Sequence, residues 1–258
     1  MLQKDNFNRF QKFLNEAEGE FHILEHQVPI ETQMEYFKYS NRLRSHRRPE
    51  KSELVVNERE FEQFVSDLQN PATPTDDKKR ILAALAVSKQ VKAYRILENY
   101  LQTVDKELTD WAFMALMESR IVLESEFTDE KLIYISTGLG GKGKKLRFYV
   151  LLLSNTGQPF LDYQQKVVER EFAYTLAKED GEIEQLIFKM NYIEMLILVP
   201  FHANITKILE HVINECNQYG DFVSNTVTLT NVKKLSDNEI TQIINKHDKK
   251  SKNIRTSH

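Results

Sequence analysis

Apolar residues recur at helical spacing through the first half of the chain, from Phe7 to about Phe127. The first stripe advances in steps of three and four residues and contains Phe7, Phe10, Leu14, Ala17, Phe21 and Leu24. This spacing places the apolar side chains on one face of a helix, because three to four residues make one helical turn. Pro29 follows and is predicted to end this helix.

Two further helices are predicted before residue 70. The first runs from about Ile30 to Arg44, with Met34 and Phe37 facing inward. The second begins at Asn57, because Asn57 and Glu60 have the spacing of a capping box. Its buried face consists of Phe61, Phe64, Val65 and Leu68.

Three more helices are predicted after a turn at Asn70–Pro74. They span Asp76–Val87, Val91–Gln102 and Glu107 to about Leu123. Their inward positions mix small and large residues, as in Ala83-Ala84-Leu85-Ala86, and small residues let neighbouring helices approach closely.

The segments Tyr94-Arg95-Ile96-Leu97-Glu98-Asn99-Tyr100-Leu101 and Trp111-Ala112-Phe113-Met114-Ala115-Leu116 resemble HEAT-like repeats. The former is similar to the second helix of one helical hairpin, and the latter to the first helix of the next. The resemblance covers about Asn57 to Glu126, under a third of the chain. It implies an interaction scaffold, since HEAT-like arrays generally act as scaffolds.

The period changes after Phe127, where β-branched and aromatic runs are bounded by turn residues. Two strands, Lys131–Ser136 and Leu146–Leu153, are expected to pair as a hairpin through the loop between them. The later elements are a helix at about Leu161–Lys178, strands at Glu184–Lys189 and Tyr192–Val199, a helix at Asn204–Tyr219 and a strand at Phe222–Leu229.

The predicted fold class is therefore α+β. An all-helical, HEAT-like region spans residues 1–127, and residues 128–236 form an α+β domain in the order ββαββαβ. Its sheet is expected to be mainly antiparallel, with helices on one face. Residues 237–258 are expected to form a short helix, Asp237 to Lys246, followed by a mobile basic tail.

Composition narrows the classes of function. The net charge of −3 gives no global attraction to nucleic acid, although three segments, including the tail from Lys233 to Arg255, are locally basic. Cys216 is the only cysteine, so an intramolecular disulfide and a cysteine-rich zinc site are excluded. No secretory signal or membrane span is evident, and a cytoplasmic protein without membrane partners is expected. No cofactor is predicted.

Four of the eight glycines lie in the segment Gly138-Leu139-Gly140-Gly141-Lys142-Gly143-Lys144-Lys145. This segment fits the first part of a P-loop, but the position that needs Ser or Thr for magnesium is Lys145. A strand follows where a P-loop requires a helix. The remaining alternatives are a hairpin tip that binds nothing and a tip that contacts phosphate or an acidic partner. The candidate contact residues are Lys142, Lys144, Lys145 and Arg147.

Two weaker candidates for chemistry remain. His22-Ile23-Leu24-Glu25-His26 matches the metal-binding pattern H-x-x-E-H, in which two histidines share a helical face, so His22 and His26 are weak metal candidates. H-x-x-E-H is the pattern of inverzincin metalloproteases, but the flanking residues show nothing else of that class, and a solvated helix face is the preferred interpretation. Cys216 is predicted to be a small buried apolar residue.

The sequence thus favours a non-catalytic protein-interaction module, a scaffold or adaptor, with a protein partner. One alternative is RNA or ribosome association through the basic glycine–lysine loop. A second alternative is an enzyme of unrecognised class acting on a phosphate-bearing substrate. The oligomeric state is not predicted.

Overall fold

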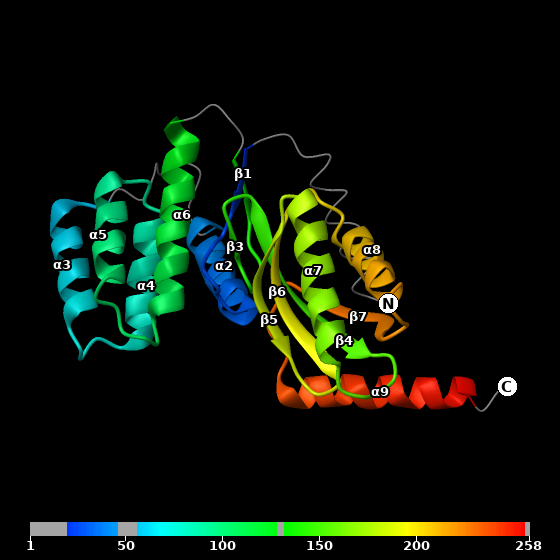
Figure 1. Cartoon of the computed structure of the whole chain (residues 1–258). Helices are drawn as coiled ribbons and strands as arrows, with labels where there is room; N and C mark the ends of the chain where they lie inside the picture. Colours follow the sequence, from blue (N-terminus) through cyan, green and yellow to red (C-terminus); the bar gives the residue numbers. More distant parts are fainter. Residues whose placement is uncertain (1–19, 46–55, 128–131, 256–258) are drawn as a thin grey trace. The chain divides into compact units, whose positions relative to one another are not determined.

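The structure, a computed structural model, describes residues 20–45, 56–127 and 132–255 (Figure 1). The chain divides into two compact units. The helical unit is Val28–Ile133, and the sheet unit comprises the described residues 20–27 and 134–255. The sheet unit therefore also takes up a short segment that precedes the helical unit.

The helical unit contains α2 (Ile30–Ser45), α3 (Glu58–Gln69), α4 (Thr75–Ala86), α5 (Val91–Leu101) and α6 (Thr109–Phe127). The predicted capping box is confirmed: the side chain of Asn57 accepts from the Glu60 N–H at 3.0 Å, and the Glu60 side chain accepts from the Asn57 N–H at 2.9 Å. Helices α4 and α5 pack on each other and on α6. The resemblance of this region to HEAT repeats stays a prediction.

The orientation predicted for α2 is wrong. Met34 and Phe37 are exposed, with 68% and 43% of their surface accessible, whereas Tyr36 and Ser40 are buried. The reason is polar: the Glu118 carboxylate on α6 accepts hydrogen bonds from Tyr36 Oη and Ser40 Oγ, each at 2.5 Å. Arg44 forms an ion pair with the same carboxylate. A buried carboxylate needs such partners, so it determines which face of α2 turns inward.

Burial also changes the ionisation of Tyr36. Desolvation raises the pKa of Tyr36 well above its ordinary value, and the adjacent Glu118 carboxylate raises it further. Tyr36 therefore stays a neutral hydrogen-bond donor at physiological pH. Its ring also packs edge-on against Trp111 of α6, with 5.2 Å between the ring centroids.

The helix predicted from Phe7 to Leu24 is wrong over its described part. Glu20–Ile23 forms a strand, β1, which pairs with β2 (Leu132–Ile135). Phe21 and Ile23 alternate with His22 and pack against the core of the sheet unit, so tertiary packing selects the extended conformation. Residues 7–19 of the predicted helix lie outside the described residues.

The main sheet contains β3 (Gly141–Lys142), β4 (Lys145–Ser154), β5 (Glu182–Phe188), β6 (Tyr192–Pro200) and β7 (Val223–Thr230), and its pairings are antiparallel. Helix α7 (Asp162–Lys178) lies between β4 and β5 in the sequence, and α8 (Ile205–Asn217) between β6 and β7. The order β4-α7-β5-β6-α8-β7, with strands side by side as β7-β4-β6-β5, is the ferredoxin-like arrangement. Strand β3 pairs with one end of β4, on the side opposite β6 and therefore on the same side as β7.

Two details of the predicted sheet differ from the structure. The predicted hairpin between the strands at 131–136 and 146–153 is wrong, because β2 pairs with β1 and β4 pairs with β6, β7 and β3. The order ββαββαβ is not confirmed, since β1 and β3 are additional strands. Most of β4 is buried, and a long buried strand needs strand neighbours on both sides.

Both faces of the sheet are covered, where helices on one face only were expected. Helices α7 and α8 bury the face that carries Phe148, Val150 and Ile197. Helix α9 (Asp237–Arg255) packs Ile240, together with the partly buried Ile243 and Ile244, against the other face. It continues beyond Lys246, where the predicted short helix ended.

Candidate functional site

The glycine–lysine segment forms a tight hairpin. Lys142 of β3 pairs with Lys145 of β4, which leaves Gly143 and Lys144 as the two turn residues. Gly143 has φ of +58°, and Lys144 has no positive φ. This is the φ pattern of a type II′ turn, whose twist matches that of the flanking strands.

The other glycines of this hairpin are required by close packing. A Cβ atom added at Gly140 would lie 2.5 Å from the carbonyl oxygen of Glu25, and one at Gly138 would lie 1.8 Å from that of Val232. A Cβ atom at Gly141 would lie 2.2 Å from the carbonyl oxygen of Lys145, whereas Gly143 has open space around it. The high glycine content is therefore explained by backbone packing without a phosphate.

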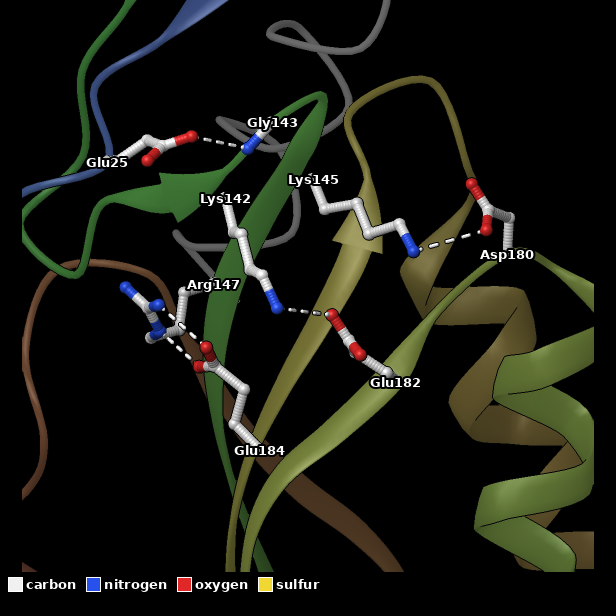
Figure 2. A network of polar contacts seen from close by, with 8 residues as sticks. All are labelled: Glu25, Lys142, Gly143, Lys145, Arg147, Asp180, Glu182 and Glu184. Carbon is white, nitrogen blue, oxygen red and sulfur yellow. Dashed lines mark hydrogen bonds and ion pairs between the residues drawn. The ribbon is translucent and has the colours of Figure 1, made fainter.

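The predicted contact residues come together, and three of them have carboxylate partners (Figure 2). Lys142 Nζ lies 3.5 Å from Glu182 Oε1, and Lys145 Nζ lies 3.1 Å from Asp180 Oδ1. Arg147 donates to both carboxylate oxygens of Glu184, with 2.7 Å from Nη2 to Oε1. Its Nη1 also donates to the carbonyl of Leu139 at 2.7 Å. The hydrogen bonds from Arg147 hold the pKa of Glu184 below its ordinary value.

The charges of this hairpin are balanced locally. Three of the four cations, Lys142, Lys145 and Arg147, face Glu182, Asp180 and Glu184, and a fourth carboxylate, Glu25, contacts the turn backbone. Glu25 accepts a hydrogen bond from the Gly143 N–H at 2.8 Å, the backbone group that a bound anion would need. The Lys144 side chain is exposed and makes no hydrogen bond or ion pair with a described residue, although its backbone carbonyl accepts from the Phe201 N–H at 3.2 Å. Any phosphate would have to compete with these carboxylates at every position but Lys144.

The acidic partners are absent from the sequence-based prediction. Asp180, Glu182 and Glu184 stand at alternate positions just before and within β5. The alternating carboxylates are visible in the sequence. They can be assigned as partners of the hairpin cations only once the β5–β6 hairpin is placed beside β4. That placement depends on non-local pairing.

The two histidines of the H-x-x-E-H pattern do not share a helical face. His22 lies on β1 and stacks on Tyr134, with 5.0 Å between ring centroids, while His26 follows the end of the strand. Within the described ranges, no three His, Cys, Asp or Glu side chains are grouped so that they could hold a metal ion.

Cys216 is buried on α8, as predicted, and burial raises the pKa of its thiol to about 12. At pH 8 roughly one thiol in 10,000 would then be ionised, and only the thiolate reacts.

We expect no reaction of the native protein with a chromogenic disulfide at pH 8, and one equivalent of reaction in denaturant. Complete reaction of the native protein within minutes would contradict this burial.

A different surface of the sheet unit was not predicted. Three exposed tyrosines lie in the same region of α7 and α8 as Arg170 of α7: Tyr163 and Tyr174 on α7, and Tyr219 just after α8. Residues 163, 170 and 174 are spaced by seven and four, which places them on one side of the helix. Arg170 donates to Tyr219 Oη at 2.9 Å and lies 5.4 Å from the centre of that ring. We call these four residues the tyrosine–arginine surface.

Comparisons with known proteins add little. No protein-family model matches the sequence, and no curated protein matches it. Among solved structures, the chain is similar to a protein from Deinococcus radiodurans R1 named a "putative transposase", with 13% identity, a TM-score of 0.36, and coverage of 42% of this chain and 94% of that one. A similarity this low carries no argument about function. Each helix in the described part of the chain is too short or too polar to cross a membrane.

Proposed function

We propose that this chain is a non-catalytic protein-interaction module and that its sheet unit binds a protein partner through the tyrosine–arginine surface. The observation that carries the proposal is the exposure of three tyrosines, 51%, 58% and 51% for Tyr163, Tyr174 and Tyr219, together with Arg170, which contacts Tyr219. Tyrosine and arginine are enriched among the residues that dominate binding energy at protein interfaces.

The contacts within this surface support the same role. Tyr219 is held by its hydrogen bond to Arg170, and Lys178 Nζ lies 4.2 Å from the centre of the Tyr174 ring. Side chains already held in place lose less conformational entropy on binding. A surface ordered in this way is suited to a defined protein partner.

A second exposed apolar pair favours a scaffold with more than one contact. Met34 and Phe37 lie one turn apart on α2 and are both exposed. Their inward neighbours bind Glu118, so α2 cannot bury this pair by simple rotation without losing those hydrogen bonds. The helical unit thus offers a second surface, in agreement with the scaffold role that the HEAT-like resemblance implies.

The experiment is affinity capture with the full chain from nuclease-treated extract, followed by measurement of the affinity for the captured protein. Changing Tyr163→Ser and Tyr174→Ser together is expected to weaken binding at least about thirtyfold, because truncating an energetically important interface residue costs more than about 1 kcal/mol. Met190→Ser is the matched control, since it removes a side chain that is 74% exposed in the turn between β5 and β6. Unchanged affinity in the tyrosine variant would refute the assignment of this surface.

The alternatives have less support. RNA or ribosome association through the hairpin would use Lys142, Lys144, Lys145 and Arg147, and three of these already face carboxylates. A phosphate-directed enzyme would need the same cations and backbone amides. Only Lys144 is available without displacing an acidic partner in the described part of the chain.

A further inference from the structure

The two outer strands of the main sheet differ in charge. Strand β5 carries Glu182 and Glu184, whereas β7, Val223–Thr230, contains no charged residue. Charges on an edge strand discourage pairing with another strand. Strand β7 pairs with β4, and its outer edge carries no charge and has no strand partner among the described residues.

The hydrogen bonds of β4 determine which backbone groups of β7 face outward. On this side of β4, the N–H groups of Arg147 and Asn155 donate to Gly140 and to Phe222. N–H groups alternate in direction along a strand, so the N–H groups of Tyr149 and Leu151 also point toward β7. These residues pair with Thr230 and Thr228, whose backbone groups therefore point back toward β4. The N–H and C=O groups of Val227 and Leu229 therefore point away from the sheet.

We propose that a second copy of this chain pairs with β7 in antiparallel orientation, with the two-fold axis at Thr228. In this register Val227 faces Leu229 of the second copy, and their outward backbone groups form four hydrogen bonds across the axis. Thr228 faces its own equivalent. The two main sheets then join into one continuous sheet through their β7 strands.

The second copy is favoured over an unrelated strand because the edge is complementary to itself. Antiparallel pairing about a two-fold axis presents the same patch from both partners. Facing threonines and a facing valine–leucine pair are favourable cross-strand neighbours, and no like charges meet. Because Thr228 faces its own equivalent, one charged substitution at this position places two like charges at the axis and weakens the dimer.

Sedimentation velocity over a concentration series tests the proposal. We expect the wild type to dimerise, and Thr228→Lys and Thr228→Glu each to raise the dissociation constant roughly tenfold or more, because like charges then meet at the axis. An equimolar mixture of the two variants should regain dimers, since Lys then faces Glu. Thr241→Lys, on the exposed side of α9, is the control and should leave dimerisation unchanged.

Three results would overturn the proposal: a wild type that stays monomeric at every concentration, a Thr228→Lys variant that still dimerises normally, or a mixture without recovery. If the variants fail to fold, a measurement on the wild type alone still tests the pairing. Hydrogen exchange of the Val227 and Leu229 amides should slow as the protein concentration rises. Exchange at these two amides that is independent of concentration would also refute the pairing.

Discussion

Gly140→Ala is expected to destabilise the sheet unit by about 1–3 kcal/mol more than Gly143→Ala, which is the typical cost of overpacking. The two glycines have similar positive φ, +64° and +58°, so both substitutions add similar backbone strain. They differ in space: the new Cβ would lie 2.5 Å from the Glu25 carbonyl oxygen at position 140 and would meet nothing within 4 Å at position 143.

The single cysteine provides a probe for this comparison. Cys216 is buried in the sheet unit, so its reaction with a thiol reagent during denaturant unfolding reports on that unit. The unfolding midpoint should be markedly lower for Gly140→Ala than for Gly143→Ala. Equal midpoints would mean that Gly140 is not packed against the segment around Glu25.

The substitution Glu118→Ala is expected to destabilise the helical unit by roughly 2–5 kcal/mol. The Glu118 side chain is only 7% exposed, and its removal leaves the buried hydroxyls of Tyr36 and Ser40 without their partner. Arg44 adds less, because its side chain is 47% exposed and solvent screens the pair.

Trp111 is the only tryptophan and packs against Tyr36, so its fluorescence follows unfolding of the helical unit. The matched control is Glu126→Ala on the same helix, whose ion pair with Lys89 is substantially exposed. We expect the control to change stability by about 1 kcal/mol or less. A Glu118→Ala variant as stable as the control would contradict the proposed anchoring of α2.

Local patterns predicted the helices of the helical unit well, because their signals lie within one element. Asn57 and Glu60 indicate the start of α3, and the helical spacing of apolar residues extends through α4 to α6. The inward face of α2 was not predictable in this way. Tyr36 and Ser40 carry hydroxyl groups, and the distant Glu118 supplies the hydrogen bonds that these groups need when buried.

The same limit explains the errors around the sheet. Phe21 and Leu24 fit a helical stripe, and the competing alternation in β1 extends over only four residues. Strand β4 was recognised, but its partners depend on pairings across β6 and β7. The hairpin lysines were identified as a group, whereas Asp180, Glu182 and Glu184 become their partners only through that non-local pairing.

We expect partner binding to depend on the tyrosine–arginine surface and not on the glycine–lysine hairpin. The most direct measurement is the affinity of the captured partner for the wild type, for Tyr163→Ser with Tyr174→Ser, and for Lys142→Ala with Lys144→Ala, each at low and high salt. We expect the tyrosine variant to lose binding and the lysine variant to retain it with little salt dependence. Loss in the lysine variant, with affinity that falls steeply with salt, would contradict the claim and favour nucleic acid.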